Sequence, residues 1–150
     1  MGLYSWKDSL SVGIDEIDAQ HRQLIEYIND LGVVLEKNAS RGEIQRVFNL
    51  LLDYTKNHFS LEEELMSKHG YPLYSEHKIA HDRFCEKLLS LYEEYLEGVS
   101  VGNKILSYLG TWLVTHISKD DNHYAPFMKP VVEKEIETSW FKSMLKKIWG

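Results

Sequence analysis

Apolar residues recur every three or four positions in four long segments of the chain. The segments cover residues 17–35, 44–65, 77–95 and 105–116, and each carries one apolar stripe flanked by polar positions. This spacing matches the turn of an α-helix that buries one face. No segment shows the strict alternation that is typical of a half-buried strand. The pattern therefore predicts an all-α protein.

Turn and capping residues separate the four segments. Ser40 with Glu43 has the sequence signature of a capping box, which predicts a helix start at this point. Gly70 and Gly98 predict the ends of the second and third helices. Because the connections are short, neighbouring helices should be antiparallel, which predicts an up-down-up-down four-helix bundle. The same rules predict helix caps at Ser75 and Ser100 and a helix stop at Pro126.

The two ends of the chain differ from these four segments. The first sixteen residues lack a helical pattern and are predicted to form an irregular N-terminal arm, anchored by Trp6 and Val12. Near the C-terminus, apolar residues share one helical face and lysines lie largely elsewhere, which predicts a short amphipathic helix. We expect a four-helix bundle over residues 1–129 and a C-terminal helical extension of the same domain over residues 130–150.

Charge and composition narrow the class of protein. The formal net charge of the 150-residue chain is -6, whereas clustered basic charge is typical of proteins that bind nucleic acid, so no nucleic-acid partner is expected. The chain lacks a secretory start and a long apolar run. Its single cysteine, Cys85, cannot form an internal disulfide, which fits a reducing compartment. These features favour a cytoplasmic protein.

Seven ionisable residues occupy positions where the apolar stripes would be expected to carry leucine or isoleucine. Buried imidazoles and carboxylates lower stability unless other groups satisfy them, and a metal centre would satisfy all seven together. Residues four apart stack on one helical face, so two ligands on the same helix can point to one centre. All four helices contribute to the set. The candidate ligands are His21, His58, Glu62, His77, His81, His116 and Asp121.

Asp121 fits a regular helix less well than the other six residues. It follows His116 by five positions, so the two side chains would point in different directions on an ideal α-helix. Both can reach one centre only if the fourth helix loosens between them, for example through a π-type turn. On spacing alone, Asp120 is an equal candidate.

The number of donors favours two metal ions over one. Imidazole and carboxylate ligands suit iron, zinc, copper or manganese, and no cysteine ligand lies in the set. Five imidazoles, two bridging carboxylates and one bridging oxo or hydroxo group would fill all but one position of two octahedral ions. A dinuclear centre with one open position would accept a small ligand.

The same residues resemble the hemerythrin family, and specifically the bacterial hemerythrins, over residues 6–127. The matching segments are DAQH ending at His21, HFSLEEELM starting at His58 and YP at 71–72, then HKIAHDRF starting at His77 and WLVTHISKDDNHY starting at Trp112. The resemblance favours Asp121 over Asp120 as the ligand.

The resemblance implies a centre of two non-haem iron ions that binds O2 reversibly, as a carrier, store or sensor. It assigns His77, His81 and His116 to one iron, His21 and His58 to the iron with the open position, and Glu62 and Asp121 to bridging positions. O2 bound at such a centre would need a dry apolar wall around it. The candidates for this wall are Leu24, Phe59, Trp112, Leu113 and Ile117.

Two alternatives remain open at this point. The first is a redox enzyme, either an oxidase or peroxidase or a protein that handles nitric oxide. The chain contains no Glu-x-x-His motif, which is the motif of ferritin-like di-iron enzymes, and no acid or base carboxylate outside the ligand set is evident. The second is a signalling or interaction module, in which the C-terminal helix docks on a membrane or a protein partner.

Overall fold

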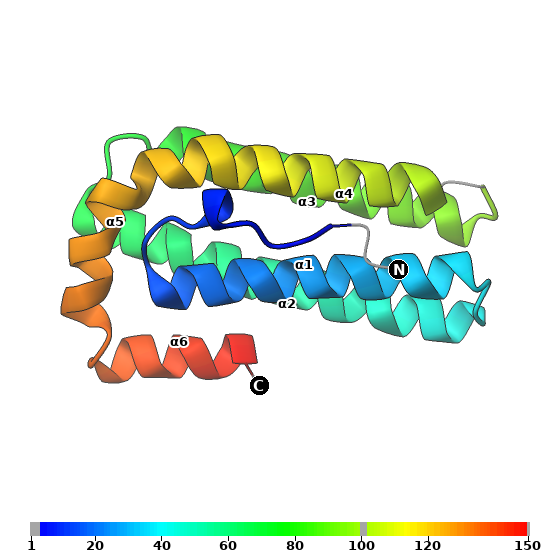
Figure 1. Ribbon diagram of the computed structural model, residues 1–150, viewed down its shortest axis with the longest axis horizontal. Coiled ribbons are helices and arrows are strands. Elements are labelled where there is room, and N and C mark those ends of the chain that lie inside the picture. The colour runs from blue at the N-terminus through cyan, green and yellow to red at the C-terminus, as the bar shows by residue number, and fades with distance from the viewer. Residues whose placement is uncertain (1–3, 100–101, 150) are drawn as a thin grey trace.

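The computed structural model describes residues 4–99 and 102–149, and they form an antiparallel helical bundle (Figure 1). Four helices run side by side along the long axis, α5 turns across one end, and α6 returns below α2 (Figure 1). No strand occurs in the described ranges, so the all-α prediction is confirmed. The elements are η1 (Asp8–Leu10), α1 (Asp15–Glu36), α2 (Arg41–His69), α3 (Tyr74–Leu96), α4 (Gly102–His116), the π-helical η2 (Ile117–Asp121), α5 (Asn122–Glu135) and α6 (Ser139–Trp149).

The helix boundaries follow local chemistry at some ends and not at others. The Ser40 hydroxyl accepts a hydrogen bond from the backbone N–H of Glu43 at 3.2 Å, which confirms the predicted start of α2. Gly70 ends this helix with a φ of 75°, a conformation that glycine adopts without steric cost. The predicted cap at Ser75 is wrong, because α3 begins at Tyr74 after Leu73, whose side chain makes no capping bond. Ser100 lies outside the described residues.

The predicted stop at Pro126 is also wrong. Both Pro126 and Pro130 lie inside α5. A proline inside a helix removes one backbone hydrogen bond and bends the helix, and the surrounding packing decides whether the helix continues. Here the chain leaves the axis of α4 through η2 and crosses the end of the bundle as α5 (Figure 1).

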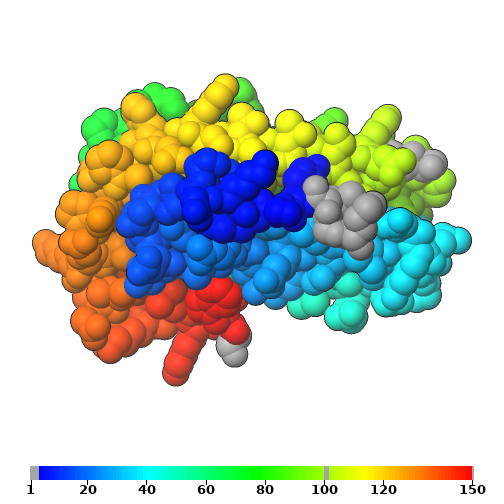
Figure 2. Space-filling model, in the orientation of Figure 1, coloured from blue at the N-terminus to red at the C-terminus, as the bar shows by residue number. Residues whose placement is uncertain are grey.

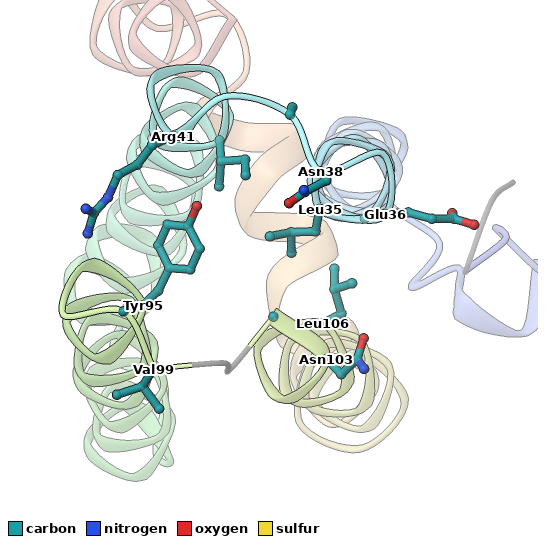
Figure 3. Close-up of a pocket in the computed structure, with 13 residues that line it drawn as sticks. Leu35, Glu36, Asn38, Arg41, Tyr95, Val99, Asn103 and Leu106 are labelled. Carbon is teal, nitrogen blue, oxygen red and sulfur yellow. The ribbon is translucent and has the colours of Figure 1, made fainter.

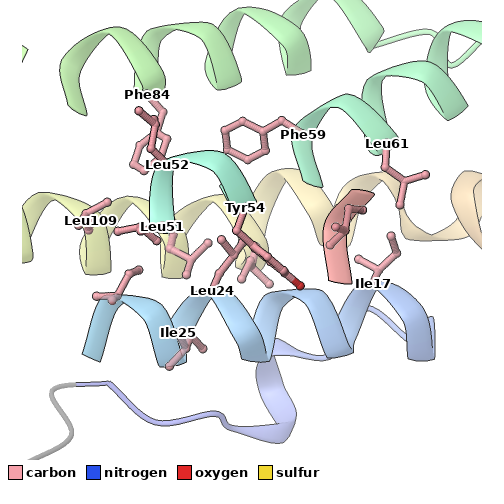
Figure 4. Close-up of a cluster of buried hydrophobic side chains, with 14 of the residues drawn as sticks. Ile17, Leu24, Ile25, Leu51, Leu52, Tyr54, Phe59, Leu61, Phe84 and Leu109 are labelled. Atoms are coloured by element: carbon pink, nitrogen blue, oxygen red, sulfur yellow. The ribbon is translucent and has the colours of Figure 1, made fainter. Parts of the chain in front are cut away.

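The core is a continuous apolar cluster between the bundle helices. Figure 4 shows part of it, where side chains of α1, α2, α3 and α4 meet. Ile17, Leu61 and Leu65 are fully buried there. The seven ionisable candidate ligands are buried among these apolar side chains.

The described part of the N-terminal arm lies on the surface between α1 and α4 (Figures 1 and 2). Asp18 accepts hydrogen bonds from the backbone N–H of Val12 at 2.8 Å and from the hydroxyl of Ser11 at 2.5 Å. The ring of Tyr4 occupies the space that a β-carbon at Gly110 would need, so a larger residue at this position of α4 would displace that ring.

The C-terminal helix packs on the outside of α2 and does not stand free (Figure 1). Its apolar side chains Phe141, Met144 and Ile148 are buried. Docking of this face on a membrane or a partner would require α6 to leave α2. Within residues 4–99 and 102–149, no helix combines the length and the apolar character needed to cross a bilayer.

Candidate metal centre

The structure brings all seven candidate ligands together inside the bundle. Each is at most 5% exposed, and they come from all four bundle helices and from η2. Their ligand atoms form two groups, and the atoms within each group lie within 4.8 Å of one another. One group is Glu62, His77, His81, His116 and Asp121, and the other is His21, His58 and Glu62.

The two carboxylates lie between these groups. Asp121 places Oδ1 at 3.0 Å from Nε2 of His77 and at 3.1 Å from Nε2 of His116. Its Oδ2 lies 3.2 Å from Nε2 of His21. Each oxygen of one carboxylate therefore faces a different set of histidines, which is the arrangement that a bridging ligand requires.

Glu62 joins the groups in a different way. Its Oε1 lies 3.5 Å from Nε2 of His58 and 3.4 Å from Nε2 of His81. The hydroxyl of Tyr124 donates a hydrogen bond to its other oxygen, Oε2. Tyr124 is fully buried on α5 and also stacks on the ring of His77.

The π-helical turn explains how Asp121 reaches the centre. It spans Ile117–Asp121, as the spacing of His116 and Asp121 predicted. Asp121 is 1% exposed, whereas Asp120 lies near the surface and accepts a hydrogen bond from Nδ1 of His116 at 2.8 Å. The turn thus lets two consecutive aspartates contact the two ring nitrogens of one histidine.

In two more histidines, the Nδ1 atom that points away from the cluster makes a hydrogen bond. Nδ1 of His58 donates to Oε1 of Gln20 at 2.6 Å, and Nδ1 of His81 donates to Oε2 of Glu63 at 2.8 Å. Sequence reasoning missed Gln20, Glu63 and Tyr124, and it weighed Asp120 only as a ligand. Gln20 and Glu63 directly adjoin candidate ligands in the sequence, but adjacency does not show which histidine each will contact.

The charges of the cluster are strongly coupled. Burial lowers the pKa of His58 and of His81 well below the usual value, and neighbouring histidines lower it further. Burial and, to a lesser extent, the nearby Asp121 carboxylate raise the pKa of Glu62 to about 8. Burial also lowers the pKa of His116, but Asp121 and the hydrogen bond to Asp120 outweigh it and raise the value to about 10. Asp121 and Asp120 thus favour positive charge on His116.

Several buried nitrogen and oxygen atoms converge without completing hydrogen bonds. Among the described residues, this holds for Nε2 of His21 and His77, Oε1 of Glu62 and both carboxylate oxygens of Asp121. Buried polar atoms are nearly always satisfied in folded proteins. A cation among these nitrogen and oxygen atoms would satisfy them, and their chemistry suits a divalent transition metal. The residues present therefore fit a metal centre.

Aromatic rings cover the side of the cluster that faces α3 and α4. Phe59 stacks on the ring of His81 with centroids 3.7 Å apart, and Trp112 stacks on the ring of His116 at 4.4 Å. The other candidate wall residues, Leu24, Leu113 and Ile117, are all buried. The ring of Phe59 thus lies closer to His81 than to His58, its neighbour in sequence, whose ring centroid is 6.0 Å away.

The two histidines outside the cluster have different environments. His123 is exposed, whereas His69 is mostly buried at the end of α2. Its Nε2 lies 3.1 Å from Oε1 of Glu135 on α5, and Lys68 contacts the same oxygen at 2.8 Å. This polar contact joins α5 to α2.

A large cavity lies away from the cluster. It measures about 820 Å³ at the opposite end of the bundle, where Leu35, Arg41 and Tyr95 are among its lining residues (Figure 3). A smaller hollow of about 450 Å³ reaches His77 and Asp120 from the surface, beside Tyr71.

Comparisons with known proteins agree with this geometry. The hemerythrin HHE cation binding domain matches residues 12–128. Bacteriohemerythrin of Stenotrophomonas maltophilia is 34% identical, with all of both chains covered, and that of Pseudomonas aeruginosa strain LESB58 is 32% identical over 97% of each chain. The crystal structure of a wild-type hemerythrin matches with a TM-score of 0.76 and 29% identity, covering 83% of this chain and 96% of that one. The chain belongs to the hemerythrin family.

Proposed function

We propose that the seven clustered residues hold two iron ions and that the protein binds O2 reversibly at this centre. His77, His81 and His116 would hold one ion, His21 and His58 the other, and Glu62 and Asp121 both. The observation that carries the proposal is the convergence of buried, unpaired nitrogen and oxygen atoms in two overlapping groups. The hemerythrin match and the names of the relatives support iron and O2.

The surroundings of these residues favour the protonation states that bind a cation. Burial holds His58 and His81 in the neutral form, which presents the lone pair of Nε2. The histidines lower the pKa of Asp121 far enough that it stays a carboxylate, although burial acts in the opposite direction. When bound, the iron pair supplies the two electrons that reversible O2 binding takes up and returns.

Apolar side chains are proposed to keep water from the bound gas. Leu24, Leu113 and Ile117 are buried, and the stacked rings of Phe59 and Trp112 close the adjoining side. Water and protons would promote loss of electrons from the centre, so a dry wall favours binding over oxidation. The proposal rests on the burial of Leu24, Phe59, Leu113 and Ile117 and on the stacking of the half-buried Trp112 on a ring of the cluster.

Metal analysis and spectroscopy of the aerobically purified protein test the proposal. We expect about two irons per chain, as the donor set requires, and a visible charge-transfer band that bleaches when the reduced, oxygenated protein is placed under vacuum. His58→Ala should lower the iron content, and His123→Ala, which removes an exposed histidine outside the cluster, should not. A colourless protein holding zinc, or irreversible oxidation on first contact with O2, would contradict the proposal.

A further inference from the structure

The hydrogen bonds around the outside of the cluster differ between its two halves. The three-histidine half contains His77, His81 and His116, and the two-histidine half contains His21 and His58. In the three-histidine half, Nδ1 of His81 donates to the carboxylate of Glu63 and Nδ1 of His116 to that of Asp120, both at 2.8 Å. In the two-histidine half, Nδ1 of His58 donates to the neutral amide oxygen of Gln20 at 2.6 Å. Nδ1 of His21, in the same half, has no hydrogen-bond partner among the described residues.

These hydrogen bonds determine which ring nitrogen of each imidazole carries the proton. A proton held on Nδ1 by an acceptor leaves the lone pair of Nε2 directed into the cluster. A carboxylate acceptor also makes the imidazole more basic and adds negative charge near the centre, whereas an amide oxygen only orients the ring. The three-histidine half therefore has one more imidazole and two more carboxylates than its neighbour.

The contacts are built across different elements. Glu63 on α2 contacts His81 on α3. Gln20 on α1 contacts His58 on α2. Asp120 reaches its histidine through the π-helical turn. The ammonium of Lys78 lies 3.8 Å from Oε1 of Glu63 and partly offsets that charge, but Lys78 contacts Asp82 more closely, at 2.9 Å.

We propose that Glu63 and Asp120 are positioning residues that make the three-histidine half the tighter of two unequal cation sites, while Gln20 leaves the two-histidine half weaker. This inference rests on the proposed function in one respect, namely that the cluster holds two cations. It adds an order of binding: the first cation enters the three-histidine half, and the second enters the half assigned to the open position.

Stepwise titration of the metal-free full-length chain with cobalt(II) tests this order. Calorimetry gives the two dissociation constants, and the visible absorption of cobalt reports the ligands of each step. We expect Glu63→Gln and Asp120→Asn each to weaken the first step by about 10- to 100-fold, with a smaller effect on the second. Gln20→Glu should tighten the second step instead.

A matched control separates positioning from general loss of charge. Glu64→Gln makes the same change at the next residue of α2, where the side chain is exposed; it should leave both steps unchanged. Asp120 is half exposed, so Asp120→Asn is expected to fold even if a buried variant does not. Melting of each metal-free variant shows whether the fold itself has changed.

The outcomes distinguish the inference from the proposed function. Two equivalents that bind with equal affinity, or equal effects of Glu63→Gln and Glu64→Gln, would overturn the inference and leave the two-cation site standing. Binding of fewer than two equivalents by the unaltered chain would overturn both.

Discussion

The hydroxyl groups of two buried tyrosines differ in what they contact. Tyr124 donates a hydrogen bond to Oε2 of Glu62, whereas the hydroxyl of Tyr54, on the face of α2 that meets α1 and α6, has no partner among the described residues. Both side chains are at most 4% exposed. A buried hydroxyl stabilises a fold when it satisfies another polar atom and lowers stability when it does not. The same chemical group should therefore have opposite effects at these positions.

Replacing each tyrosine with phenylalanine tests this difference. Tyr124→Phe leaves a buried oxygen of Glu62 unpaired, so the free energy of unfolding of the metal-free protein should fall by about 1–3 kcal/mol. Tyr54→Phe removes an unpaired hydroxyl and should leave stability unchanged or raise it. Urea unfolding followed by circular dichroism measures both. Equal losses from the two variants would show that the Tyr124 contact contributes nothing specific.

At the scale of the helical element, α6 shows where periodicity suffices and where it does not. The apolar face of this helix was predictable from its sequence, but its contact with α2 was not. Phe141 is fully buried there, and the side-chain amide of Asn57 on α2 donates to the backbone carbonyl of Lys147 at 3.2 Å. Periodicity identifies an apolar face, whereas the surface that covers it depends on the path of α5.

Truncating the buried anchor of α6 measures the strength of this packing. Phe141→Ala should lower the free energy of unfolding by about 3–5 kcal/mol because it opens a cavity against α2. Lys146→Ala, on the exposed face of the same helix, should change it by no more than about 0.5 kcal/mol. Thermal or urea unfolding provides the comparison. If both variants unfold alike, α6 does not pack on the bundle in solution.

The π-helical turn and α5 show the same division between local and distant information. Five-residue spacing between His116 and Asp121 was enough to predict an irregular helix, because both side chains had to reach one centre. The continuation through Pro126 was not predictable in this way. Proline weakens a helix locally, but packing against the end of the bundle keeps Tyr124, Met128 and Val132 buried and the helix intact.

For the whole molecule, the cluster is where the bundle helices are linked by polar groups. Two carboxylates and five imidazoles lie at its centre, and in the metal-free protein their charges must balance one another. A cation held by these residues would neutralise the carboxylates and would link the bundle helices α1, α2, α3 and α4 through the side chains that hold it. Metal binding should therefore stabilise the entire fold and not only the site.

Metal removal tests this global effect. The loaded protein should melt at a higher temperature than the metal-free protein, and free metal at about 100 times its dissociation constant should add about 2.7 kcal/mol. Asp121→Ala should abolish most of this difference, because it removes the carboxylate that faces both groups. Differential scanning calorimetry with and without a chelator measures the shift. An identical shift in the variant would mean that the stabilising metal binds elsewhere.

Much of this protein was determined by its sequence alone. The helical period defines the bundle helices and places five histidines and Glu62 on their buried stripes, and the motif order identifies the hemerythrin family. These inferences succeed because a helix is a local structure, so residues three, four and seven apart share a face whatever the rest of the chain does.

The tertiary structure alone decided which residues support that cluster. Gln20 contacts His58, Glu63 contacts His81 and Tyr124 contacts Glu62, each from a different helix. It also decided that α6 covers α2 and that Asp120 accepts a hydrogen bond from Nδ1 of His116. Contacts of this kind depend on the rotation and axial offset of one helix against another, which are set by packing of the whole core and not by any single segment.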